Sequence, residues 1–89
     1  MKYKHIIIVD DHELMSKGIA SLINILPQYK VTFEVRNGKD LITLLKNNYN
    51  VPDIILLDIN MPIMNGFETM IWLKENHPQI PVLALTINN

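Results

Sequence analysis

Two short runs that are apolar at every position constrain the fold more than any other feature of this sequence. They span residues 6–9 (IIIV) and 54–57 (IILL). Their length and their β-branched side chains predict strands rather than helices. A strand with no polar position must be covered on both faces, as the inner strands of a parallel sheet are. We therefore expect an α/β fold with helices on both sides of one sheet.

Two more apolar runs, residues 31–35 and 82–85, also predict strands, and segments with helical periodicity separate the four. The strands and helices alternate, which predicts βαβ units. Expected helices cover about 13–26, from Asn37-Gly38 to about 46, and about 66–76. The expected apolar stripes are Leu14, Ile19, Leu22, Ile23 and Leu26 in the first helix, Leu41, Leu44 and Leu45 in the second, and Phe67, Met70, Ile71 and Leu73 in the third. We expect Asp11 to be the N-cap of the first helix.

The composition describes one domain, residues 1–89, and excludes several classes of function. The chain has 89 residues, a net charge of −1 and no cysteine. A near-neutral chain lacks the clustered cations that nucleic-acid binding needs, so any DNA contact must lie outside it. No run approaches the roughly 20 apolar residues of a membrane span, and the apolar run near the N-terminus is too short for a signal peptide. We therefore expect a cytoplasmic protein with no disulfides and no thiolate metal site.

Acidic residues follow both fully apolar strands directly. Asp10 and Asp11 follow the first, and Asp58 follows the third. Ligands of open α/β sheets bind outside the carboxyl ends of the strands, so these carboxylates should converge there. At ~4 Å and an effective dielectric constant of 20, each pair would repel by about 4 kcal/mol unless a cation joined them. Mg²⁺, which prefers oxygen ligands and keeps waters and phosphate oxygens in its shell, is the natural cation.

Two neighbouring segments add to this edge. Pro62 and Gly66 predict a sharp turn after Asp58 that can aim a backbone carbonyl at the metal. Thr86 follows the fourth strand, where its hydroxyl can hydrogen-bond a phosphoryl oxygen.

Together, these features resemble the receiver domain of two-component response regulators. The resemblance rests on an apolar strand ending in Asp-Asp, an Asp-x-x-Met-Pro-x-x-x-Gly loop, and a strand ending in Leu-Thr. The segment from Asp10 to Leu14, with the following Gly18, is similar more narrowly to receivers that precede a helix-turn-helix of the NarL/LuxR type. The resemblance to receiver domains implies a flavodoxin-like (CheY-like), doubly wound parallel sheet with strand order 2-1-3-4-5.

The same resemblance implies roles for individual residues. Asp58 is the expected phosphoacceptor, receiving its phosphoryl group from a histidine kinase or a phosphotransfer protein. Mg²⁺ is expected at Asp11, Asp58 and the backbone carbonyl of Asn60, with Asp10 acting through water or from the second shell. Thr86 is the expected switch hydroxyl. The expected output is transcription regulation by a DNA-binding domain outside this chain.

The resemblance also implies elements that follow the fourth strand. A complete receiver continues through a fourth helix, a fifth strand with a Lys that contacts the phosphoryl group, and a fifth helix, whereas this sequence stops at Asn89. We expect an incomplete receiver in which the fourth strand is an edge and the sheet face over residues 6–9, beside the first helix, is open to water. An exposed edge invites pairing, so we expect a homodimer or an exchange of elements between chains.

Other interpretations compete with these. Taken alone, the Asp pair is no more than a helix cap and a solvated neighbour, and His12 is more often a polar surface residue than a ligand. Trp72 is expected to be half covered and structural. A receiver-like module that works without phosphorylation is one alternative function. An aspartyl-nucleophile phosphatase is another, but it needs a general acid where this chain has Asn60.

Overall fold

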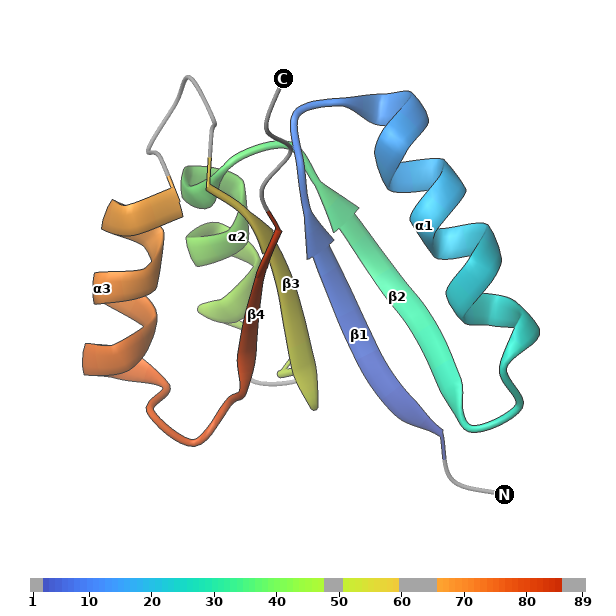
Figure 1. The fold of residues 1–89 in the computed structure, drawn as a ribbon. Helices are drawn as coiled ribbons and strands as arrows, with labels where there is room; N and C mark the ends of the chain where they lie inside the picture. Colours follow the sequence, from blue (N-terminus) through green and yellow to red (C-terminus); the bar gives the residue numbers. More distant parts are fainter. Residues whose placement is uncertain (1–2, 48–50, 60–65, 86–89) are drawn as a thin grey trace.

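The computed structural model describes residues 3–47, 51–59 and 66–85, which form four strands and three helices in alternation (Figure 1). In chain order the elements are β1 (Lys4–Val9), α1 (Glu13–Ile25), β2 (Tyr29–Val35), α2 (Gly38–Leu45), β3 (Ile54–Asp58), α3 (Gly66–Asn76) and β4 (Val82–Leu85). These bounds confirm all seven predicted elements to within a few residues. None of the helices in the described ranges is long and apolar enough to cross a membrane.

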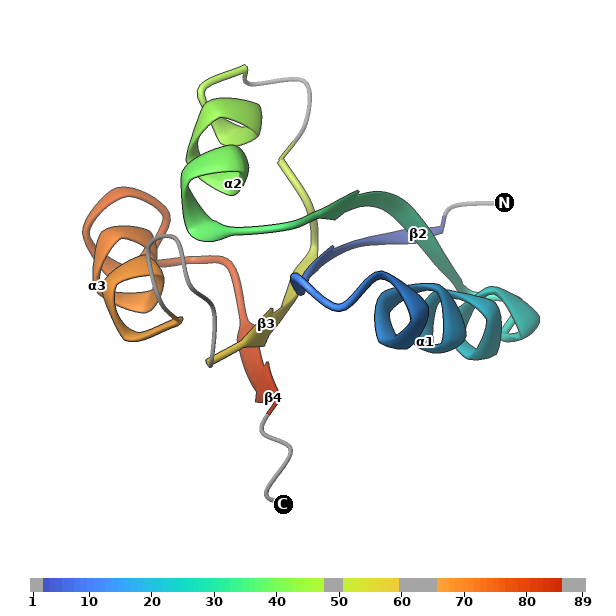
Figure 2. The same ribbon diagram turned by 90° about the horizontal axis from the view of Figure 1, so that it is seen from above.

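The strands form one parallel sheet in the order β2-β1-β3-β4. β1 pairs with both β2 and β3, and β3 pairs in turn with β4. Figure 2 shows α1 on one side of the strands and α2 and α3 on the other. The fold is therefore the doubly wound arrangement that the alternation predicted, with the two fully apolar strands at its centre.

The apolar runs are buried on both faces, because neighbouring side chains of a strand point in opposite directions. Ile7 and Val9 face the side of α2 and α3, where they pack in a cluster that also contains Ile55, Leu57, Leu41, Leu45 and Leu73. Ile6 and Ile8 face the side of α1, in a cluster that also contains Ala20 and Leu56. The sheet thus has a core on each side.

The predicted apolar stripe of α1 was wrong in part. Ser16 and Ala20 are the buried residues of this helix, while Leu14 and Leu22 are 88% and 69% exposed. Ile19 and Ile23 do pack against the cluster beneath. Small side chains allow the helix backbone to lie close to the sheet, so the larger apolar residues on its other sides face outward.

The stripe of α3 needs a similar correction. Thr69 and Leu73 are buried, but Phe67 and Ile71 are exposed. Trp72 is half buried and packs against the core cluster, which agrees with its predicted structural role.

β4 is the outermost strand of the described sheet, and Leu83 on it is 56% exposed. The prediction that residues 6–9 would be open to water was wrong, because α1 covers Ile6 and Ile8 completely enough to bury both. The open region is a groove beside α1 that extends from Ile6 of β1 to Leu83 of β4. Its lining residues are Ile6, Ile23, Leu26, Tyr29, Ile54, Leu56 and Leu83.

Candidate metal centre

Three carboxylates meet where β1 and β3 end. The two strands are neighbours and pair Val9 with Leu57, so the residues that follow them reach the same edge. Asp10 is 3% exposed and Asp58 is 8% exposed, while Asp11 is half buried. One ligand atom from each of Asp10, Asp11, His12 and Asp58 lies within 4.8 Å of the other three. The structure therefore brings together the three acids that the sequence predicted to converge.

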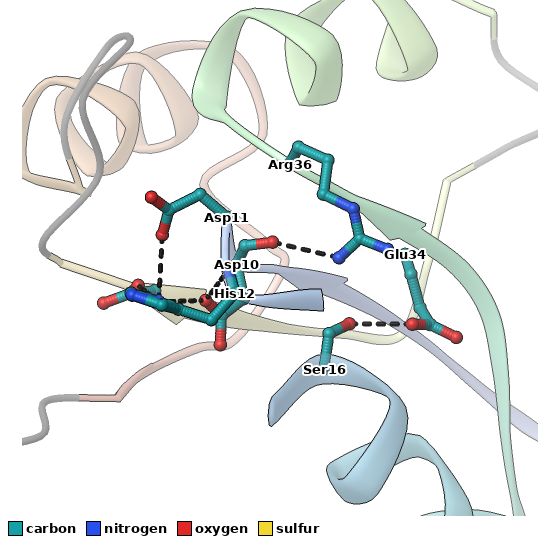
Figure 3. A network of polar contacts seen from close by, with 7 residues as sticks. Asp10, Asp11, His12, Ser16, Glu34 and Arg36 are labelled. Atoms are coloured by element: carbon teal, nitrogen blue, oxygen red, sulfur yellow. Dashed lines mark hydrogen bonds and ion pairs between the residues drawn. The ribbon is translucent and has the colours of Figure 1, made fainter. Parts of the chain in front are cut away.

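His12 also belongs to this cluster, although the sequence favoured a polar surface residue at this position. Its Nδ1 lies 3.1 Å from Oδ1 of Asp10 and 3.1 Å from Oδ1 of Asp11. Figure 3 draws these contacts as dashed lines. A third distance, 3.7 Å, joins Nδ1 to Oδ2 of Asp58. The hydrogen bond to Asp10 raises the pKa of His12, and the charges of Asp11, Asp10 and Asp58 add to this effect. The ring is exposed on its outer side, but Nδ1 faces the acids.

The start of α1 also differs from the prediction. His12, not Asp11, is the N-cap residue, and its side chain makes no capping hydrogen bond. The backbone N–H of His12 instead donates to Oδ1 of Asp10 at 2.8 Å. Asp11 faces the acidic cluster, where its Oδ1 is buried and accepts no hydrogen bond from the described residues, although Nδ1 of His12 lies 3.1 Å away as an ion-pair partner. A buried carboxylate oxygen that accepts no hydrogen bond is costly, so this atom fits a position beside a positive charge, either a protonated His12 or a metal ion.

Residues at the end of β2 make hydrogen bonds to the chain around the three carboxylates (Figure 3). Arg36 donates from Nη1 to the backbone oxygen of Asp10 at 3.2 Å. Ser16, fully buried on α1, donates from Oγ to Oε1 of Glu34 at 2.8 Å. These contacts tie α1 and the bend after β1 to β2. Arg36 directly follows β2, so the argument from strand ends that selected the aspartates would have selected it too.

Gly66 places the first turn of α3 directly against the chain that follows Asp58. Its N–H donates to the oxygen of Ile59 at 3.0 Å. A Cβ atom at this position would lie 2.3 Å from Cα of Ile59 and 2.8 Å from the oxygen of Asp58. Only a residue without a side chain allows this approach.

The other predicted site residues, Asn60, Pro62 and Thr86, lie outside the described residues. Leu85, the last described residue of β4, pairs with Asp58 of β3.

The model of the response regulator receiver domain family matches residues 6–89. This chain belongs to that family. Among curated relatives of the receiver, the transcriptional regulatory protein DegU of Brevibacillus brevis is 37% identical over 94% of the chain. The nitrate/nitrite response regulator protein NarL of Escherichia coli (strain K12) is also 37% identical over 94% of the chain. The matched regions are 35% and 38% of those two proteins, so the chain spans little more than a third of their length.

The fold of the receiver also recurs in solved structures. A two-component response regulator of the LuxR family from Aurantimonas sp. has a TM-score of 0.87 at 25% identity. The match covers 99% of this chain and 61% of that one. Receiver domains generally bind Mg²⁺ in an acidic pocket, and the donor set of Asp10, Asp11 and Asp58 is of the oxygen type that Mg²⁺ prefers.

Proposed function

We propose that this receiver is the phosphoacceptor of a two-component system and that Asp58 is the residue phosphorylated. The observation that carries the proposal is the meeting of Asp10, Asp11 and Asp58 within one ligand sphere at the carboxyl edge of the sheet. Three carboxylates at this separation favour a divalent cation. They also provide a nucleophile beside it, which is the combination that phosphoryl transfer to an aspartate needs.

In the proposed reaction, one oxygen of the Asp58 carboxylate attacks the phosphorus of a phosphohistidine in line. The new O–P bond forms as the N–P bond breaks, and the bonding pair returns to the imidazole of the donor. The product is an acyl phosphate on Asp58. Mg²⁺, when bound, neutralises charge on the transferred group. Asp58 is held for this attack by β3 and by the close approach of Gly66 behind it.

We assign the metal ligands within the same proposal. Asp11 and Asp58 bind Mg²⁺ directly, together with the backbone carbonyl of Asn60. Asp10 acts through water, in keeping with its Oδ1, which already accepts the backbone N–H of His12. Thr86 is proposed to donate its hydroxyl to a phosphoryl oxygen.

The partners are part of the proposal. Receivers of this kind interact with histidine kinases, so a kinase or a phosphotransfer protein is the expected donor. DegU and NarL carry the names of transcriptional and nitrate/nitrite regulators, which favours a DNA-binding output domain outside this receiver.

We further propose that residues 1–89 form the N-terminal part of the receiver. Among the described residues β4 is an edge strand and Leu83 is exposed, which favours a homodimer or exchanged elements; sedimentation over a concentration series tests this.

Acetyl phosphate, a small phosphodonor, tests the proposed acceptor. Wild-type protein incubated with acetyl phosphate and Mg²⁺ should gain one hydroxylamine-labile phosphoryl group, measured by intact mass. Asp58→Asn should gain none. Asp53→Asn is the matched control, because Asp53 precedes the same strand at its opposite end and is exposed.

Continued labelling of Asp58→Asn would place the acceptor elsewhere. No labelling of the wild type, either by acetyl phosphate or by a phosphorylated kinase, would favour a module that works without phosphorylation. Loss of labelling in Asp53→Asn as well would point to a general effect of substitution on the fold.

A further inference from the structure

The imidazole of His12 lies among the carboxylates more centrally than an ordinary ion pair requires. Its Nδ1 is within 3.1 Å of an oxygen of Asp10, 3.1 Å of an oxygen of Asp11 and 3.7 Å of an oxygen of Asp58. An imidazolium that balanced one neighbouring charge would need to approach one carboxylate. This nitrogen instead approaches all three.

The spacing of Nδ1 and the oxygens of Asp11 and Asp58 is compatible with one coordination shell. Neighbouring ligands placed 2.1 Å from an octahedral ion are roughly 3.0 Å apart, and opposite ligands are roughly 4.2 Å apart. The distance from Nδ1 to Asp11 is close to the first value, and the distance to Asp58 lies between the two values. The four ligand atoms of the cluster spread over up to 4.8 Å. Small rotations of the side chains would bring Nδ1, Asp11 and Asp58 around one ion, with Asp10 reaching it through water.

The backbone holds His12 at this position from both sides. Its N–H donates to Oδ1 of Asp10, and its carbonyl oxygen accepts the N–H of Ser16 at 3.0 Å in the first turn of α1. Ser16 is in turn tied to Glu34 on β2. The side chain of His12 is 66% exposed, so the ring lies at the surface and can turn toward an ion from solvent without any opening of the core. The ligand is therefore both fixed at its base and accessible.

We propose that Nδ1 of His12 is a nitrogen ligand of the metal centre and that it shifts the preference of this site toward divalent ions of the first transition row. The inference rests on the proposed function, because it concerns the ion that Asp11 and Asp58 are proposed to bind. Carboxylates and water suit Mg²⁺, whereas an imidazole nitrogen suits ions such as Ni²⁺ and Zn²⁺. The ratio of Ni²⁺ affinity to Mg²⁺ affinity should therefore be higher with the His12 nitrogen in the site than with oxygen ligands alone.

Calorimetry on the full-length protein, with Ni²⁺ alone and with Mg²⁺ alone, tests the preference. His12→Gln should lower the affinity for Ni²⁺ by about tenfold. It should leave the affinity for Mg²⁺ within about twofold, because Mg²⁺ gains little from nitrogen. His5→Gln is the matched control, since His5 is exposed near the start of β1 and its hydrogen bond to Asp53 uses the backbone N–H. This control should bind both ions as the wild type does.

A spectroscopic measurement reports the ligand itself. With Mn²⁺ bound, electron spin echo envelope modulation should detect a directly coordinated ¹⁴N nucleus in the wild type and in His5→Gln. The signal should be absent from His12→Gln. No ¹⁴N modulation in the wild type would overturn the proposal.

The remaining outcomes separate this inference from the proposed function. An unchanged ratio of Ni²⁺ to Mg²⁺ affinity in His12→Gln would overturn the inference. So would a gain in affinity for both ions, which would show that the ring only fills the site as a counter-ion. If Mg²⁺ still binds the wild type and is lost from Asp11→Ala, the proposed metal centre stands in either case. A wild type that binds neither ion would overturn both.

Discussion

The two faces of the sheet are covered in different ways. On one face, α2 and α3 bury large side chains, among them Leu41, Leu45 and Leu73, against the strands. On the other, α1 is the one helix among the described residues, and it buries Ser16 and Ala20 while Leu22 points outward. The helix α3 also leaves Phe67 and Ile71 exposed, so the two faces differ in the residues they bury, which include three leucines on one face and are small on α1. A single helix that lies close to the sheet needs small residues there, so its apolar pattern no longer identifies its buried face.

The largest contrast between the faces should come from truncating a leucine on each. Leu41 is fully buried on α2, so Leu41→Ala should lower the free energy of unfolding by about 2–5 kcal/mol through lost burial and a cavity. Leu22 is mostly exposed, so Leu22→Ala should change it by no more than about 0.5 kcal/mol. Urea denaturation of both variants measures the difference. Equal losses would show that α1 is covered by another surface in solution.

Glycines on the two faces offer a second contrast. A Cβ at Gly66 of α3 would meet backbone atoms of Asp58 and Ile59, which cannot rotate away, so Gly66→Ala should destabilise the fold by about 1–3 kcal/mol. A Cβ at Gly18 of α1 would meet nothing within 4 Å. Gly18→Ala should therefore stabilise the protein by about 0.5–1 kcal/mol, through helix propensity. Opposite shifts of the thermal midpoint would confirm the contrast, and shifts of the same sign would contradict it.

The polar contact beneath α1 should matter less than the packed core on the other face. Ser16→Ala removes the donor to the half-buried carboxylate of Glu34 and should cost about 1–2 kcal/mol of unfolding free energy. Thr43 on α2 also donates its hydroxyl, to the backbone oxygen of Lys39, but it is exposed. Thr43→Ala should stay within about 0.5 kcal/mol, measured by the same denaturation. A similar small effect at Ser16 would show that water replaces its hydroxyl.

The limits of prediction from this sequence follow the same division. The strands and the meeting of Asp10, Asp11 and Asp58 followed from patterns that need no knowledge of packing, because a strand that is apolar throughout has no other place than the centre of a sheet. The order of the strands followed from the resemblance to receiver domains. The buried face of α1 did not, since it depends on how closely one helix approaches the sheet. His12 was missed for a related reason: its ring is on the surface, and only the bend after β1 turns Nδ1 toward the acids.

The pH dependence at the start of α1 should be the smallest effect. The pKa of His12 is raised, chiefly by its hydrogen bond to Asp10 and next by the charge of Asp11. A raised pKa in the folded state means that the charged ring stabilises the fold. This contribution is fully present below the ordinary pKa of histidine, about 6.5, and is lost as the pH rises through the raised value. The unfolding free energy of metal-free protein should therefore decrease slightly as the pH rises through the raised pKa of His12. The variant His12→Gln should not show this decrease.

Nuclear magnetic resonance of the His12 ring measures the shift directly. In metal-free protein, Asp10→Asn should lower the pKa of His12 more than Asp58→Asn does, because the hydrogen bond to Asp10 is the main cause and the charge of Asp58 contributes least. The order of the two variants is the decisive readout, since a change in the overall fold would alter both alike. A larger effect of Asp58→Asn would mean that the ring leaves Asp10 in solution and lies closer to the end of β3. The His12 ring would then not hold the position beside Asp10 that the bend between β1 and α1 gives it.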